Sequence, residues 1–85
     1  MRTLSELPNV GKVLEHNLKQ IGITTPEALR ETGVAQVFLR IKEEVDAGAC
    51  LSMLYGIAGA IKGVRHTNLS KETKEELKAF YKSLE

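Results

Sequence analysis

The amino-acid sequence predicts an all-α domain, and three patterns support this prediction. Apolar residues recur at intervals of three and four, the spacing of one helix face, in several successive segments. Glycine and proline separate these segments at short intervals, as turns between short helices do. Alternation of apolar and polar residues, which marks a half-buried strand, is not sustained anywhere. We therefore expect a compact bundle of about five short helices.

The first predicted helix follows a tight turn at residues 7–11, Leu-Pro-Asn-Val-Gly. The apolar spacing places one set of residues on its inward side: Val10, Val13, Leu14, Asn17, Leu18 and Ile21. The opposite side holds Lys12, Glu15, His16 and Lys19. Gly22 is predicted to end the helix, with Ile23 folding back onto its last turn.

Two further helices are predicted before the middle of the chain. Thr25 and Pro26 suit the N-cap and first helical positions, so a short helix is expected from there to Thr32. Gly33 separates it from an amphipathic helix with apolar positions Val34, Val37, Phe38, Ile41 and Val45. The outer face of that helix carries Arg40, Glu43 and Glu44, and residues 46–48 close the unit.

Residues 50–62 are apolar nearly all round, which predicts a central helix with neighbours on several sides. Glycine within a helix costs about 1 kcal/mol relative to alanine, so these glycines need a reason. We expect Gly56, Gly59 and Gly63 to allow a tight helix crossing. Cys50, next to Ala49, is predicted to be a small core residue.

A polar linker is predicted at residues 63–69, and Ser70 is expected to begin a last helix that runs to about Ser83. The apolar face of this helix consists of Leu77, Phe80, Tyr81 and Leu84. One edge of it carries four lysines: Lys71, Lys74, Lys78 and Lys82. The glutamates between them favour a solvated face, with ordinary pairs such as Lys71 with Glu75, over a face that follows a phosphate backbone.

Composition places the chain, residues 1–85, among single folded domains. Hydrophobic residues make up 42% and charged residues 27%, a balance typical of globular proteins rather than disordered tails. The formal net charge is only +1, so any attraction to nucleic acid has to come from the placement of charges.

The sequence also bears on location. No stretch approaches the ~20 apolar residues of a membrane span, and the N-terminus lacks the apolar core of a signal peptide. The lone Cys50 cannot close an intramolecular disulfide, which fits a reducing compartment. We expect a cytoplasmic protein without a membrane partner. The final Leu84-Glu85 is compatible with either a tag remnant or a native last turn.

No constellation of residues predicts an enzyme. Nothing in the sequence brings Ser52, His66 and Asp46 together, and no nucleophile motif surrounds the serine. His16, His66 and Cys50 lack the paired spacing of metal ligands, and no glycine-rich phosphate loop is present. We therefore expect no catalysis, metal, cofactor or small-molecule substrate.

The segment 4–23 looks like the hairpin and second helix of a helix-hairpin-helix motif. Pro8 fixes a turn dihedral, Gly11 lets the backbone approach a partner, and the free N–H groups that open the next helix attract anions. Such a turn can hold a DNA phosphate without reading bases. The candidate DNA-binding residues are Pro8, Asn9, Val10, Gly11, Lys12 and Lys19. Asn9 stands where many DNA-binding hairpins have their first glycine.

The same residues allow a different interpretation, in which the hairpin is only a connector between packed helices and a helical surface binds a protein partner. A second basic cluster, Lys62, Arg65 and His66, is likewise open to two interpretations. It adds positive charge for DNA, or Arg65 and His66 hydrogen-bond the last carbonyls of the central helix. Duplex DNA and a protein both remain candidate partners.

Short motifs in a fixed order along nearly the whole chain resemble the C-terminal domain of the TfoX/Sxy competence regulators. They are Leu7-Pro8-Asn9-Val10-Gly11, Ile21-Gly22-Ile23, Thr25-Pro26-Glu27, Gly33-Val34, the apolar helix at 51–63, and Arg65-His66 before Leu69. The resemblance implies a compact helical domain with a helix-hairpin-helix-like element, in proteins connected with natural transformation and its transcriptional control. The larger regulators also carry an N-terminal domain, so it implies a stand-alone C-terminal-type domain here. The hairpin also looks locally like the DNA-contacting turn of the RNA polymerase alpha C-terminal domain.

Overall fold

The computed structural model describes residues 3–84 and is built from helices. In chain order these are η1 (Leu4–Glu6), α1 (Lys12–Gln20), α2 (Pro26–Thr32), α3 (Val34–Glu44), α4 (Leu51–Lys62), η2 (His66–Asn68) and α5 (Lys71–Ser83), where η marks a short 3-10 helix. Within the described residues there is no strand, and the predicted all-α fold is confirmed. A single 3-10 turn, η1, stands in the place of the leading helix of a helix-hairpin-helix motif.

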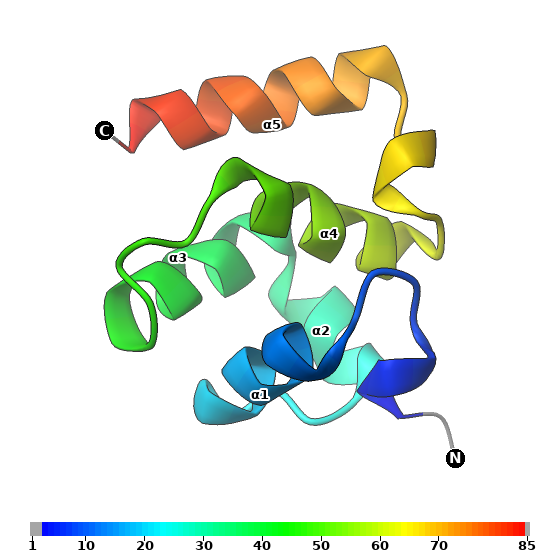
Figure 1. Ribbon diagram of the computed structural model, residues 1–85, viewed down its shortest axis with the longest axis vertical. Coiled ribbons are helices and arrows are strands. Elements are labelled where there is room, and N and C mark those ends of the chain that lie inside the picture. Colours follow the sequence, from blue (N-terminus) through cyan, green and yellow to red (C-terminus); the bar gives the residue numbers. More distant parts are fainter. Residues whose placement is uncertain (1–2, 85) are drawn as a thin grey trace.

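The apolar helix α4 lies at the centre of the molecule, between α5 on one side and α1 and α2 on the other (Figure 1). It contacts α2, α3, α5 and η2, and Leu54, Ile57 and Ala60 are fully buried along it. Packing on several sides is what its sequence predicted, because a helix with no polar face has to be covered all round.

Local signals set the ends of the helices. Gly22 adopts a left-handed backbone at φ 84°, so that the N–H of Ile23 reaches the carbonyl of Leu18 at 2.9 Å and ends α1. The Thr25 hydroxyl accepts a hydrogen bond from the Ala28 N–H at 3.1 Å and starts α2. Ser70 caps α5 in the same way. These three predictions are confirmed.

The outer helix α5 packs on the core with a half-buried face. Leu77, Phe80, Tyr81 and Leu84 all contact the core, and the Tyr81 ring meets the buried Phe38 edge to face at 6.0 Å between centroids. Of the Leu84-Glu85 pair, Leu84 packs against the core, whereas Glu85 lies outside the described residues.

Two predictions of burial are wrong. Cys50 is exposed, because it precedes α4 in an extended conformation and its side chain does not join the helix's inward stripe. Its neighbour Ala49 is buried instead. Val13 is 73% exposed. It lies in the first turn of α1, where a side chain leans toward the helix N-terminus and so past the end of the packed surface.

The close approach at the helical glycines is made by the N-terminal hairpin and not by a crossing helix. A Cβ at Gly59 would lie 2.6 Å from the Val64 carbonyl oxygen and against the Asn9 amide nitrogen. A Cβ at Gly56 would meet the Asn9 Cβ at an ordinary 3.7 Å. Gly63 acts differently, since its left-handed backbone ends α4. Space is therefore tight at Gly59 and sufficient at Gly56.

This difference predicts opposite effects of the same substitution in one helix. Gly59→Ala is expected to lower the free energy of unfolding by about 1–3 kcal/mol, because the added methyl group displaces backbone or the Asn9 amide. Gly56→Ala, the matched control, should leave stability unchanged or raise it by up to about 1 kcal/mol through helix propensity. Urea unfolding of the two variants measures both values, and equal losses would contradict the assignment.

Candidate binding groove

The hairpin forms one wall of an open groove of about 920 Å³. Residues from η1, the hairpin and the first turn of α1 make this wall, α4 forms the floor, and Arg65 with the start of η2 makes the opposite wall. The lining residues are Glu6, Leu7, Pro8, Asn9, Gly11, Lys12, Val13, Leu14, Ser52, Met53, Gly56, Arg65, His66 and Thr67. In Figure 1 the hairpin reaches up beside the end of α4, next to η2.

Asn9 joins the two walls with its side chain. Its backbone is left-handed at φ 69°, the only positive φ outside glycine in the described chain. The Nδ2 amide donates to the Val64 carbonyl at 3.0 Å and, more weakly, to the Gly56 carbonyl at 3.4 Å. The Oδ1 atom accepts from the His66 backbone N–H at 2.9 Å. The side chain thus points into the protein.

This geometry explains why an asparagine suits this position of the hairpin. Asparagine tolerates the left-handed conformation better than most residues, so the turn keeps the backbone that a glycine would give it. The side chain then uses a donor and an acceptor that glycine lacks. Because it turns inward, its amide does not occupy the outer surface of the hairpin.

The start of α1 is open. No side chain caps the helix at Gly11, and Gly11, Lys12 and Val13 are all exposed. The N–H groups of such a first turn have no partner within the helix and carry partial positive charge. Val10, by contrast, is buried at 7% exposure and serves the hairpin only by packing.

The structure brings together some of the predicted basic residues and separates others. Lys12, Arg65 and His66 all line the groove, together with one acidic residue, Glu6. Lys19 lies outside it and is 4.0 Å from the Glu15 carboxylate one helical turn away. The predicted cluster of Lys62, Arg65 and His66 is therefore divided, because Lys62 does not line the groove.

Lys62 lies toward α5, with its Nζ 3.5 Å from the Thr73 hydroxyl. The idea that Arg65 and His66 cap α4 through their side chains is wrong, because the backbone fulfils that role. The N–H groups of Gly63 and Val64 donate to the carbonyls of Ala60 and Gly59 at the end of α4. Arg65 and His66 are thus both exposed on the groove.

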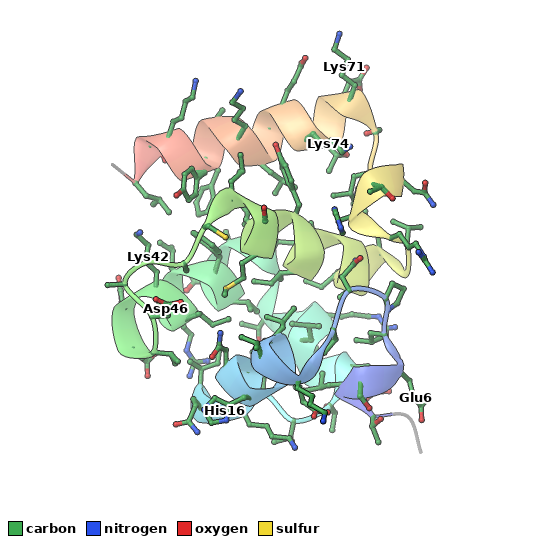
Figure 2. The ribbon with its side chains drawn as sticks, viewed as in Figure 1. Glu6, His16, Lys42, Asp46, Lys71 and Lys74 are labelled. Carbon is green, nitrogen blue, oxygen red and sulfur yellow. The ribbon has the colours of Figure 1, made fainter. Side chains whose placement is uncertain are left out.

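The remaining candidate residues lie away from this groove. Lys71 and Lys74 lie on α5, and His16 lies on the outward side of α1 (Figure 2). The expected Lys71–Glu75 pair is not formed, since the ion pairs within residues 3–84 are those of Glu15 with Lys19 and Glu44 with Arg40.

A serine and a histidine, two residue types that occur in catalytic sites, lie on the same groove. Ser52 and His66 both line it, although no hydrogen bond joins their side chains in the described part of the chain. Asp46 lies in the turn between α3 and α4, where its Oδ1 accepts from the Gly48 N–H at 2.9 Å. The serine, histidine and aspartate are therefore not arranged as a catalytic triad, which needs each member within hydrogen-bond reach of the next.

The floor of the groove was not predicted from the sequence. Met53, Ser52 and Gly56 belong to the face of α4 that meets the hairpin, and an all-round apolar helix does not reveal which face that is. The available signal was the spacing of Gly56 and Gly59, one helical turn apart, which indicates that some backbone passes close to that face.

The fold and the groove define a small all-α domain with an open groove beside its N-terminal hairpin. The family model of the TfoX C-terminal domain matches residues 1–81. The chain therefore belongs to the TfoX C-terminal domain family, as the order of its motifs predicted.

Known relatives agree with this assignment. The DNA transformation protein TfoX1 of Aliivibrio fischeri is 30% identical over 76 residues, which cover 89% of this chain but 36% of that protein. The chain thus spans about a third of the length of this curated relative. Family membership and the relation to transformation proteins follow, whereas the activity of the whole relative does not carry over by itself.

Two crystal structures of Listeria monocytogenes proteins share the fold. One, of an uncharacterized protein in a triclinic form, is 48% identical, has a TM-score of 0.94, and covers 98% of this chain and 93% of that one. The other, of a protein of unknown function in a tetragonal form, is 50% identical with a TM-score of 0.92 and covers 96% and 99%.

The exposure of Val13 predicts a contrast with its neighbour Leu14, which is 8% exposed. Val13→Ala should change the free energy of unfolding by no more than about 0.5 kcal/mol, because a surface position loses little contact. Leu14→Ala should lower it by about 2–5 kcal/mol, because it opens a cavity in the core. Chemical unfolding of both variants measures the difference, and a large loss for Val13→Ala would show that the groove is closed in solution.

Proposed function

We propose that this chain is a non-enzymatic regulatory module that binds duplex DNA weakly and without sequence preference through the groove beside its hairpin. The observation that supports the proposal is the convergence of Lys12 with Arg65 and His66, which are more than 50 residues away in the sequence, on one groove. Positive groups that the fold collects around an open helix N-terminus suit a chain of phosphates.

The charge distribution supports a weak and unspecific contact. A net charge of +1 provides no long-range attraction, so binding would depend on the few cations at the groove. Lysine, arginine and backbone N–H groups position a protein on phosphates but do not read bases. Each phosphate neutralised releases counterions, which makes the affinity fall with salt.

The family relation supports a role near DNA uptake and its regulation. The relative from Aliivibrio fischeri is described as a DNA transformation protein, and we propose that this chain acts in a related process in the cytoplasm. The part of the relative that this chain covers is about a third of its length, so its share of the activity is the contact made by this one domain.

A second candidate function is protein binding through the same groove, and the exposure of Val13 favours it. An apolar side chain that is 73% exposed, in a groove that is also lined by the half-buried Pro8 and Met53, gives the groove an apolar part. Protein interfaces concentrate apolar contact at their centre and place charges at the rim. In this alternative the hairpin is a scaffold, and Lys12 and Arg65 are rim residues.

Titration of isotope-labelled protein with a short DNA duplex, followed by backbone amide shifts in NMR spectra, separates the two functions. DNA binding predicts shifts at Asn9 to Lys12 and at Arg65 and His66, at low salt, that fade at moderate salt. Shifts confined to α5 would move the contact to its lysine edge. A spectrum unchanged at millimolar DNA would remove DNA binding and leave protein interaction as the function.

Charge reversal on and off the groove provides the matched test. Lys12→Glu combined with Arg65→Glu should weaken DNA binding by about tenfold or more at low salt and lower the slope of log affinity against log salt by about 2. Lys19→Glu changes the same amount of charge per residue, but Lys19 lies outside the groove beside Glu15, so a much smaller effect is expected. Fluorescence anisotropy over a salt series measures the slopes, and equal effects of Lys12→Glu and Lys19→Glu would rule out a groove-specific contact.

A further inference from the structure

The two walls of the groove are held together by one side chain. Between the hairpin (residues 7–11) and the segment 64–66, the hydrogen bonds in the described chain are those from Asn9 Nδ2 to the Val64 carbonyl and from the His66 N–H to Asn9 Oδ1. Both ends of one amide are used, and they hold the backbone on either side of Arg65. The backbone around Arg65 is thus tied to the opposite wall as well as to the end of α4, where the Val64 N–H donates to the Gly59 carbonyl.

We propose that Asn9 is the positioning residue of the groove, and that it keeps Arg65 and His66 opposite Lys12 so that both walls contact one DNA backbone. This inference rests on the proposed function, and it assigns to Asn9 a part in binding although its own side chain faces inward. The role is indirect, since Asn9 acts through the backbone at Val64 and His66.

The chemistry of the position admits few other residues. The backbone at φ 69° disfavours side chains other than asparagine and aspartate, and glycine adopts it without strain. The two partners are a carbonyl and an N–H, so the side chain has to donate at one atom and accept at the other. Asparagine meets both conditions, whereas ionised aspartate only accepts and glycine does neither.

Gly59 of α4 provides the space that this contact requires. A Cβ at Gly59 would lie against the Asn9 amide nitrogen and the Val64 carbonyl oxygen, whereas a Cβ at Gly56 would meet the Asn9 Cβ at an ordinary contact distance. The central helix therefore lacks a side chain at the place where the amide enters. Two features that are far apart in the sequence, an asparagine in a left-handed turn and a helical glycine, serve the same contact.

A double-mutant cycle between Asn9 and Arg65 tests the inference on the full chain. In the parent protein Arg65→Ala should lower the slope of log affinity against log salt by about 1, the loss of one phosphate contact. Asn9→Gly keeps the backbone conformation and removes the amide, so it should lower the slope by about the same amount. In the Asn9→Gly background, Arg65→Ala should then have no further effect on the slope.

The slope distinguishes positioning from a general loss of stability. Partial unfolding lowers the concentration of active protein at every salt concentration, but it does not change the number of counterions that the folded protein releases. The His66 amide provides a second readout in the free protein, since its hydrogen bond to Asn9 is expected to shift its NMR resonance and slow its exchange. Asn9→Gly should remove both effects, and Asn9→Asp, which retains the acceptor, should keep them.

The outcomes distinguish a failure of this inference from a failure of the proposed DNA binding. If the parent chain shows no salt-dependent DNA binding, the proposed function fails and this inference fails with it. If the parent binds and Arg65→Ala lowers the slope equally in both backgrounds, the inference alone is overturned. If Asn9→Gly does not fold, Asn9→Asp takes its place in the cycle: loss of the two donated bonds predicts a smaller Arg65→Ala effect in that background, and an undiminished effect overturns the inference.

Discussion

The geometry of the groove depends on one constraint at the surface of the central helix, where the Asn9 side chain enters a space left by Gly59. The apolar core would hold α4 among its neighbours without this contact, because aliphatic burial has no direction. Hydrogen bonds do have direction, and those of Asn9 specify where the hairpin and the segment before η2 lie relative to each other. Core packing thus builds the domain, and one amide sets the geometry of its groove.

The sequence was sufficient to predict those features whose structural signal is local, such as the ends of helices. The ends of α1, α2 and α5 were predicted from Gly22, Thr25 and Ser70, because a cap is made by residues within a few positions of each other. The predictions for Val13 and Cys50 were wrong for the opposite reason. Burial at the first turn of a helix, or just before it, depends on which distant segment covers that place, and the period of the apolar residues does not contain that information.

In the candidate site, too, local features were predictable from the sequence and long-range contacts were not. Pro8, Gly11 and Lys12 were recognised from the hairpin pattern, and Arg65 and His66 from their local charge. Their arrangement around one groove was not predictable, because it is produced by long-range contacts of Asn9 with a segment more than 50 residues away. The place of Asn9 in the hairpin was readable from the sequence, whereas its left-handed backbone and the inward direction of its side chain were not.

The small number of cations in the groove limits what this domain does by itself. For the proposed DNA contact, one charge from each of Lys12 and Arg65 gives a salt slope that cannot greatly exceed about 2, since each phosphate contributes about 0.9. Non-specific contacts of this size are weak at physiological salt, and they become effective when a second binding element raises the local concentration of DNA. A relative almost three times as long as the matched region has the chain length to carry such an element, and under the proposed function the groove would add affinity there without restricting the DNA sequence. Rigid walls matter most in this regime, because few contacts leave little binding energy to offset the ordering of a mobile loop.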